Sequence, residues 1–309
     1  MWRVLTLKWS VFVELTEIYT FIGNVFLGLI GIAYSVYVNQ SFHLLHTLVY
    51  MLAIFCFHVF ANAFNNLKDY HNASDAHNYK ETSNTIGRYQ LPLRLVEMTC
   101  LIAIVLFLMC GAYFFFQHHW LLMAVGVIGF GVGVLYSSGP APLNSLPVSE
   151  IIAAGAMGYL VPLGAFLANQ TVAGIDFSVL VNLLLICVVP VMTMFNCLLA
   201  NNTCDLEEDI VNGRKTLVYY LDKPLAVRFF QLVCVLMFVV PFFLLLTHRI
   251  AGLPALLIAY APIAWRGLQP YYQNQLKRQT FPLVIHHMER TLHLYALLYA
   301  CDVLLKLVM

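Results

Sequence analysis

Long apolar segments recur along the whole chain, and shorter polar segments separate them. An α-helix needs about 20 mostly apolar residues to cross the hydrocarbon core of a bilayer. The eighth segment has the least certain ends because Pro254 and Pro262 interrupt it, although membrane helices tolerate proline when neighbouring helices satisfy the freed backbone groups. The pattern predicts nine transmembrane helices, at residues 12–36, 44–66, 92–116, 120–137, 150–169, 177–200, 226–247, 250–265 and 290–308.

Four of the connections between these segments stand out. Residues 67–91 and 201–225 are long and polar, residues 266–289 are basic and aromatic, and residues 138–149 are short and rich in proline. No linker or change in composition marks off a soluble domain. We therefore expect one all-α domain over residues 1–309, which is a polytopic membrane protein.

The composition supports this class. The chain is 61% hydrophobic and 10% charged, whereas an ordinary soluble domain carries roughly a quarter charged residues. The formal net charge of +1 argues against a nucleic-acid partner, which requires a basic face. Eight scattered cysteines contain no Cys-x-x-Cys pair, so they predict buried thiols and neither a zinc site nor a disulfide framework.

The basic residues predict the orientation in the membrane. If the N-terminus is cytoplasmic, 14 of the 16 Lys and Arg residues fall on the cytoplasmic side, and only Arg249 and Lys306 fall on the other. An excess of positive charge marks the cytoplasmic side of membrane proteins. The two long polar loops then lie in the cytoplasm.

Two segments rich in Asn and Asp end the second and the sixth predicted helices. A carboxylate beside hydrocarbon is costly, so two such clusters at one membrane face predict a working site. The alternative is a pair of ordinary acidic loop ends, and their occurrence on the same side, each after an Asn-Asn pair, argues against it. The first reads Asn65-Asn66-Leu67-Lys68-Asp69 with Asp75 beyond it; the second reads Asn201-Asn202-Thr203-Cys204-Asp205 with Asp209 and then Gly213-Arg214-Lys215-Thr216.

Their spacing favours binding of a divalent cation. Asp205 and Asp209 are four residues apart, so on a helix they share a face with Asn201, and Asn65 and Asp69 have the same spacing. Mg²⁺ prefers a few carboxylates together with phosphate oxygens. Metal ions and basic side chains stabilise charge that develops on phosphate. The candidates are Asp69, Asp75, Asp205 and Asp209 for the metal and Lys68, Arg88, Arg214 and Lys215 for a diphosphate.

Other polar residues in apolar segments have simpler interpretations. His58 is expected to be a hydrogen-bonded core histidine, with contact to a substrate as the alternative. Asp302 and Lys306 are expected to form a local ion pair, because they are four residues apart. Glu14 and Glu17 either reach the site or act near a helix end.

At the two Asp-rich segments the chain resembles the UbiA-type intramembrane aromatic prenyltransferase superfamily. Within it, the closest similarity is to the 1,4-dihydroxy-2-naphthoate polyprenyltransferases of menaquinone synthesis. The second segment resembles theirs nearly position for position, and so does the stretch Tyr136-Ser137-Ser138-Gly139-Pro140-Ala141-Pro142-Leu143 followed by Glu150. One departure is Asn66, which stands where the family usually has Asp.

The resemblance implies a nine-transmembrane-helix bundle around a central cavity, covered by cytoplasmic cap loops. It implies Mg²⁺, a polyprenyl diphosphate donor and an aromatic acceptor, dihydroxynaphthoate, which is prenylated with decarboxylation. Site residues then have three roles: Asp69, Asp205, Lys68 and Arg88 in catalysis, Asn65, Asn201, Arg214, Lys215 and Tyr136 in substrate binding, and Asp69, Asp75, Asp205 and Asp209 at the metal.

These features together predict an integral protein of a bacterial cell membrane. The alternatives left open are another acceptor, such as 4-hydroxybenzoate, homogentisate or haem, and a transporter or a catalytically silent scaffold. Transporters place carboxylates near the bilayer midplane, whereas these carboxylates lie at one face.

Overall fold

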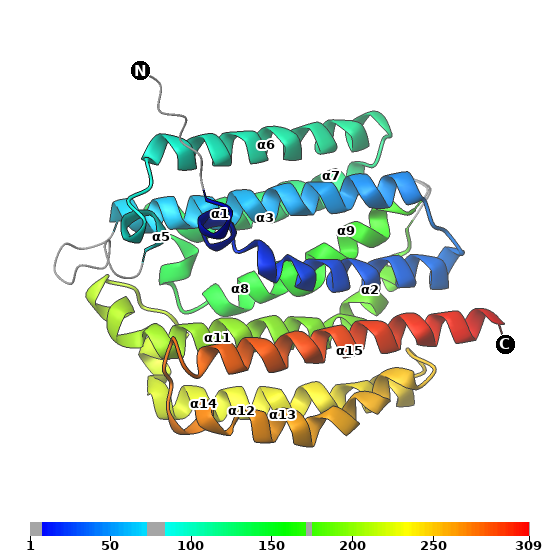
Figure 1. Cartoon of the computed structure of the whole chain (residues 1–309). Helices are drawn as coiled ribbons and strands as arrows, with labels where there is room; N and C mark the ends of the chain where they lie inside the picture. Colours follow the sequence, from blue (N-terminus) through cyan, green and yellow to red (C-terminus); the bar gives the residue numbers. More distant parts are fainter. Residues whose placement is uncertain (1–7, 73–83, 171–174, 309) are drawn as a thin grey trace.

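The computed structural model describes residues 8–72, 84–170 and 175–308. Asp75 and the middle of the first long polar loop, residues 73–83, lie outside the described residues. Over the three described ranges the chain is helical, without strands, as the sequence predicts. Figure 1 shows the long helices lying side by side with their ends gathered at two opposite ends of the bundle.

Seven helices in these ranges are long and apolar enough to cross a membrane, or eight if one bent pair forms a single span. Each corresponds to a predicted segment. They are Ile18–Asn39 (η1, Ile18–Thr20, and α2, Phe21–Asn39), α3 (Leu44–Asn72), α6 (Leu93–Phe116), α7 (Trp120–Ser137), Ser149–Ala168 (α8, Ser149–Gly155; η4, Ala156–Leu160; α9, Val161–Ala168), α12 (Leu217–Leu246) and α15 (Phe281–Val308), with α10 (Phe177–Ile186) and α11 (Val188–Val211) as the bent pair.

The bend between α10 and α11 has a local cause. The two helices meet at 49° beside Cys187. Pro190 lacks the N–H that would bond to the carbonyl of Ile186, the last residue of α10, and its ring clashes with that carbonyl. In the same way, Pro162 follows a π-helical turn, η4, between α8 and α9.

The predicted helix at 250–265 is broken in the structure. The segment forms η5 (Leu253–Tyr260), α13 (Ala261–Gly267) and α14 (Gln269–Gln273), each with a proline in its first turn. It is not among the long helices, so the count of nine spans is not confirmed. η5 packs against α12 and α15.

The predicted ion pair between Asp302 and Lys306 does not form. The Asp302 carboxylate is buried and accepts hydrogen bonds from the backbone N–H groups of Ala251 and Leu253, at 2.6 and 2.9 Å. These donors precede and begin η5, so Asp302 ties this segment to α15. The Lys306 ammonium lies over the Tyr37 ring, 4.8 Å from its centroid. Unpaired N–H groups at a helix start attract a carboxylate more strongly than an exposed lysine does.

The first predicted helix is also interrupted. α1 (Trp9–Thr16) ends at Glu17, whose φ of 47° is left-handed, and the membrane span starts at Ile18. α1 packs against α3 and α5 (Thr85–Arg88) at one end of the bundle, where Figure 1 shows it nearly end-on in dark blue.

Close helix contacts hold the bundle together. α3 packs on α6, α11 on α12, and α2 on both α9 and α15. Small residues allow helix backbones to approach closely in a membrane. At Gly31 of α2 a Cβ atom would lie 2.0 Å from the carbonyl oxygen of Pro162 on α9.

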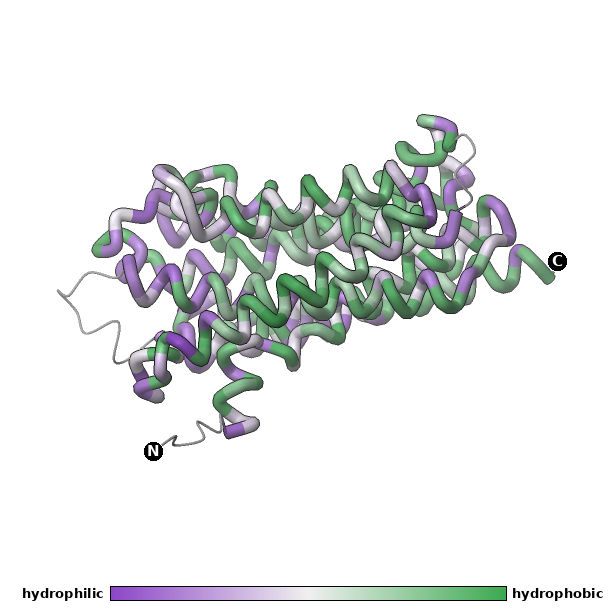
Figure 2. The backbone as a smooth tube through the Cα atoms, turned by 90° about the horizontal axis from the view of Figure 1, so that it is seen from above, coloured by the Kyte–Doolittle hydropathy of each residue, from purple (hydrophilic) through white to green (hydrophobic). Residues whose placement is uncertain are grey.

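The polarity of the surface follows the long axis of the bundle. Figure 2 shows apolar residues along the bodies of the helices and hydrophilic residues concentrated towards the ends. The chain is thus an integral membrane protein by the number, length and composition of its helices.

Candidate active site

The two Asp-rich segments lie on the last turns of α3 and α11. Both helices continue past their apolar part, so Asn65 and Asp69 project from α3 and Asn201, Asp205 and Asp209 project from α11. α3 and α11 end at the same end of the bundle, on the left of Figure 1. Both helices thus extend beyond their predicted ends at residues 66 and 200, and the helical spacing assumed for the Asn and Asp side chains is observed.

A single arginine links the two segments. Arg214, just after α11, forms an ion pair through Nη2 with Asp69 of α3, and its Nη1 lies 3.6 Å from Oδ1 of Asp209. The Arg214 backbone N–H donates to the carbonyl of Asp209 at 2.8 Å, which fixes the loop. Only 13% of the Asp69 side chain and 7% of that of Asp209 are exposed, so solvent screens these contacts little. Carboxylates that are 140 residues apart in the sequence thus share one cation.

Asp205 has a different cationic partner. The Lys277 ammonium forms an ion pair with its carboxylate and donates to Oδ1 of Asn201 at 2.6 Å. Lys277 lies between α14 and α15, in the third polar connection. Its contact with the site was not predicted, and the only hint in the sequence was the basic character of that loop.

Neighbouring amides and hydroxyls hold the first segment in place. Asn65 donates to Asp69 Oδ2 at 3.3 Å and accepts a hydrogen bond from Ser137, at the end of α7, at 2.6 Å. Asn66 instead donates to the backbone carbonyls of Leu15 and Asn62, at 3.3 and 3.1 Å. The residue that departs from the family pattern therefore joins α1 to α3.

The second segment is supported by a buried carboxylate. Glu150 is 1% exposed and accepts hydrogen bonds from Asn202 at 2.7 Å and from Ser149 at 2.8 Å. These two hydrogen bonds satisfy the Glu150 carboxylate, which would be costly to bury without partners. The sequence stretch around 136–150 thus supplies contacts to both segments, through Ser137 and Glu150.

The remaining candidates are placed less directly. Lys68 lies over the Phe64 ring, 5.2 Å from its centroid, and Lys215 lies 5.8 Å from the centroid of Tyr219. Arg88 forms an ion pair with Glu14 of α1. Tyr136 is half-buried near enough to Glu150, Arg214, Asp69 and Asp209 for their charges to act on it.

His58 has the structural role expected of a core histidine. Its Nδ1 lies 3.2 Å from the Asn24 amide, and its Nε2 lies 3.1 Å from the carbonyl oxygen of Glu17. Both ring nitrogens are therefore engaged, and the ring ties α2 and α3 to the break after α1.

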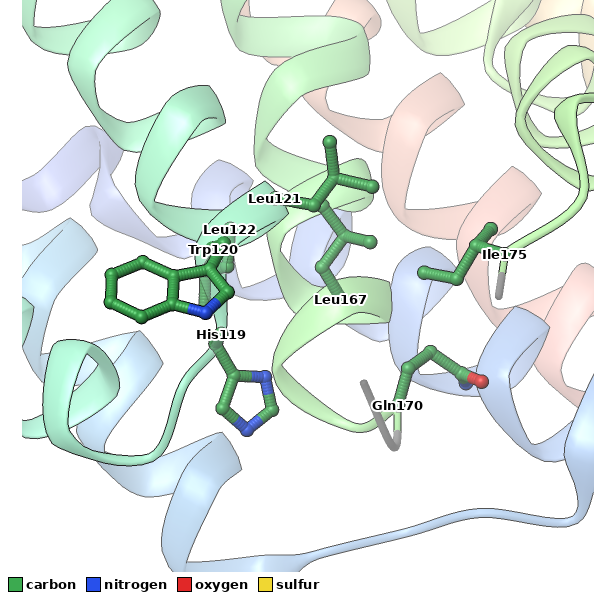
Figure 3. A pocket seen from close by; sticks show the side chains of 7 residues that line it. All are labelled: His119, Trp120, Leu121, Leu122, Leu167, Gln170 and Ile175. Carbon is green, nitrogen blue, oxygen red and sulfur yellow. The ribbon is translucent and has the colours of Figure 1, made fainter. Parts of the chain in front are cut away.

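One hollow lies at the opposite end of the bundle (Figure 3) and has a volume of about 110 Å³. Burial lowers the pKa of His119 in its wall, and His46 and His43 lower it further, so the imidazole is neutral near pH 7. A neutral wall does not attract a diphosphate. The lining residues are His119, Trp120, Leu121, Leu122, Leu167, Gln170 and Ile175. A second, largely apolar hollow of about 330 Å³ lies along α12. Neither is the predicted central cavity.

The site suits a hard cation by its donors. Carboxylate and amide oxygens are the ligands that Mg²⁺ prefers, and Mg²⁺ is usually held by one or two carboxylates together with substrate phosphate. Within residues 8–72, 84–170 and 175–308, no three His, Cys, Asp or Glu side chains form a complete metal cage. The oxygen donors of Asp69, Asp205 and Asp209 are of the type that a divalent cation prefers.

Comparison with known proteins identifies a prenyltransferase family whose sequence model matches most of the chain. Residues 24–299 match the sequence model of the UbiA prenyltransferase family. A curated relative, 1,4-dihydroxy-2-naphthoate octaprenyltransferase of Bacillus subtilis (strain 168), is 26% identical over 157 residues, which are 50% of this chain and 48% of that protein. The match thus spans about half the length of that relative.

Solved structures share the fold. A UbiA homologue from Archaeoglobus fulgidus bound to GPP and Mg²⁺ has a TM-score of 0.64 and 15% identity, and the match covers 95% of this chain and 99% of that one. The apo UbiA homologue from Aeropyrum pernix K1 has a TM-score of 0.65 and 13% identity, with 94% and 98% covered. A structure of digeranylgeranylglyceryl phosphate synthase has a TM-score of 0.63 and 16% identity, with 95% and 98% covered.

Proposed function

The chain belongs to the UbiA prenyltransferase family, and we propose that it transfers a polyprenyl group from a prenyl diphosphate to an aromatic acceptor with the help of Mg²⁺. The proposed acceptor is 1,4-dihydroxy-2-naphthoate, which loses its carboxyl group as CO₂. The observation that carries the proposal is the convergence of Asp69 and Asp209 on one guanidinium. Carboxylate oxygens of Asp69 and Asp209 both lie within 3.6 Å of the Arg214 guanidinium nitrogens. The two acidic segments are therefore close enough to share a diphosphate and its metal ions.

Each side chain of the site then has a role. Asp69, Asp205 and Asp209, together with Asp75, would hold Mg²⁺, which when bound neutralises the leaving diphosphate. Arg214 can grip phosphate oxygens with two parallel hydrogen bonds, while Lys277 and Lys215 act as point charges. Asn65 donates to Asp69 and so orients that carboxylate, while Asn201 accepts a hydrogen bond from the Lys277 ammonium that also pairs with Asp205.

The reaction follows from this placement. The allylic C–O bond breaks, and its electron pair leaves with the diphosphate. The ring carbon that bears the carboxylate, made electron-rich by an ionised hydroxyl, attacks the allylic carbon and forms the new C–C bond. The bond from that ring carbon to the carboxylate then breaks, CO₂ leaves, and the electron pair of that bond restores the aromatic ring, so no separate general base is required. The apolar helices exclude water, which would otherwise capture the cation.

We also propose the setting of the reaction. The excess of basic residues at the end that carries the site favours a cytoplasmic active site in a bacterial cell membrane, with a cytoplasmic N-terminus. The polyprenyl tail of the donor would then enter the bilayer from its cytoplasmic leaflet.

The metal-binding carboxylates can be tested by single substitutions. Asp69→Asn and Asp205→Asn remove a charge but keep the side-chain size, so each purified variant should remain folded and lose at least about 100-fold in transfer rate. Glu207→Gln is the matched control, because Glu207 is 74% exposed and pairs with Lys223. Full activity in either aspartate variant refutes the metal assignment.

Acceptor choice is a separate measurement. Membranes that contain the protein are incubated with labelled prenyl diphosphate and, in turn, dihydroxynaphthoate, 4-hydroxybenzoate and homogentisate. Labelled product with dihydroxynaphthoate alone supports the proposal. Product with another acid reassigns the acceptor, and an absence of diphosphate release with every acceptor favours the scaffold or transporter alternative.

A further inference from the structure

The last helix, α15, carries two polar side chains inside its apolar span whose polar atoms lack partners in the described chain. Glu289 is half-buried and forms no hydrogen bond or ion pair with any described residue. One turn further, Nε2 of His293 is buried without a hydrogen-bond partner. Buried polar groups are nearly always hydrogen-bonded, and a carboxylate within a membrane span is rare and costly. Two such groups one turn apart therefore indicate a ligand.

Both groups face the interior of the bundle. α15 packs against α2 and α11 (Figure 1). The His293 ring stacks on Phe26 of α2, with 4.0 Å between the ring centroids. Glu289 lies close enough to Cys197 of α11 and Tyr19 of η1 for its charge to act on both. His293 therefore lies at the seam that α15 forms with α2 and α11, and Glu289, four residues earlier, shares its face of α15.

The depth of this seam relates it to the reaction. Cys197 precedes Asp205 by eight residues on α11, which corresponds to about 12 Å along the helix axis. Glu289 therefore lies about two turns deeper in the membrane than the carboxylates at the polar end. With a diphosphate held at Asp205, the allylic carbon points towards this depth, and the attacking ring must lie beside it.

We propose that Glu289 and His293 bind the hydroxyl-bearing edge of the aromatic acceptor, an inference that rests on the proposed function. A ring hydroxyl donates to the Glu289 carboxylate, and Nε2 of His293 forms a second hydrogen bond. The stacked pair of Phe26 and His293 forms an apolar wall for the ring. Glu289 repels a carboxylate, so an aromatic acid binds with its hydroxyl edge towards α15 and its acid group turned away.

A binding experiment tests the contact without turnover. The purified full-length protein is titrated with 4-hydroxy-2-naphthoate, whose hydroxyl lies away from its acid group, and with 4-methoxy-2-naphthoate, which lacks the donor. The unmodified protein should bind the hydroxyl compound about 10-fold more tightly, as expected for a hydrogen bond to a charged group. In Glu289→Leu this preference should vanish. An equal preference in both proteins overturns the proposal.

Steady-state kinetics separates this site from the donor site. Glu289→Gln keeps the side-chain size, and His293→Phe keeps the ring stacked on Phe26, so both variants should fold. Each should raise the KM for the acceptor about 10-fold and leave the KM for prenyl diphosphate unchanged. Glu207→Gln, an exposed carboxylate elsewhere, should change neither.

The outcomes distinguish the two proposals. An unchanged acceptor KM in both variants, with transfer intact, overturns the assignment of Glu289 and His293 and leaves the proposed function standing. A changed KM for the donor alone shows that the pair lines the path of the prenyl tail, which also overturns it. If the unmodified protein binds prenyl diphosphate but transfers to no aromatic acid, the proposed function itself fails.

Discussion

Each carboxylate of the Asp-rich segments that the structure describes is balanced by a basic side chain from a neighbouring loop. Arg214 serves Asp69 and Asp209, and Lys277 serves Asp205. The pairing has a simple cause, because an unpaired carboxylate at the edge of the hydrocarbon is costly. The same cations lie where a diphosphate would bind. A divalent cation and the basic side chains therefore compete for the same carboxylate oxygens. A cation that binds these oxygens displaces Arg214 or Lys277, and the displaced side chain can then pair with a phosphate group of the substrate.

This competition predicts two opposite effects of Lys277→Met. Loss of the ammonium should tighten binding of Mn²⁺ alone by about 2- to 5-fold, because the pair is partly exposed and of surface strength. The same change should raise the KM for prenyl diphosphate. Mn²⁺ titration followed by electron paramagnetic resonance, together with donor kinetics, measures both.

Two further variants check the assignment of Lys277. Lys277→Arg should have the same Mn²⁺ affinity and the same KM for prenyl diphosphate as the unmodified protein. Lys223→Met, which breaks the exposed pair with Glu207, should also leave both quantities unchanged. Mn²⁺ and donor affinities that fall together in Lys277→Met indicate a purely structural role.

At the scale of the helix, proline accounts for two of the interruptions of regular structure. Pro190 accounts for the bend between α10 and α11, and Pro254 and Pro262 account for the broken segment before α15. The interruption by Pro254 and Pro262 is predicted from the sequence, whereas the bend beside Pro190, inside the predicted helix 177–200, is not. The sequence predicts a soft boundary at 250–265, whereas the structure shows three short helices, the first of which is tied to Asp302.

Close contact between α2 and α9 predicts a stability effect at Gly31. In Gly31→Ala the new methyl group would lie 2.0 Å from the Pro162 carbonyl oxygen, so the helices must separate. We expect a loss of about 1–3 kcal/mol in the free energy of unfolding, measured by denaturation in detergent. Gly126→Ala on α7 is the matched control, since no atom lies within 4 Å of its added methyl group. Equal stability of the two variants contradicts the contact.

At the scale of the whole molecule, charge and apolar length organise the bundle. The ends of α3 and α11 and the start of α15 lie at one end of the molecule (Figure 1), where Figure 2 shows hydrophilic residues and where Arg214 and Lys277 pair with the site carboxylates. The site therefore lies at the membrane face that the charge distribution predicts to be cytoplasmic.

Orientation is tested by labelling single cysteines with a membrane-impermeant maleimide. In a chain with Cys204 and Cys301 replaced by serine, His118→Cys should react in intact bacterial cells. Val211→Cys, at the end of α11, should react only after permeabilisation. Both positions are exposed in the structure, so accessibility to the reagent reports the side of the membrane. The reverse pattern of labelling contradicts the cytoplasmic location of the site.

The sequence by itself determined the helical class, most of the spans, and the two Asp-rich segments. Apolar length and local spacing are properties of the chain near each residue, and the bilayer imposes them directly. Asn65 with Asp69, and Asn201 with Asp205, therefore lie on single helix faces as predicted.

The tertiary structure alone decided which charges meet. Pairing of Asp69 with Arg214, of Asp205 with Lys277, and of Arg88 with Glu14 depends on how helices far apart in the sequence pack. The same holds for Glu289 and His293, whose inward position follows from the contacts of α15 with α2 and α11. Periodicity gives the face of a helix on which a residue lies, but only packing gives the neighbour of that face.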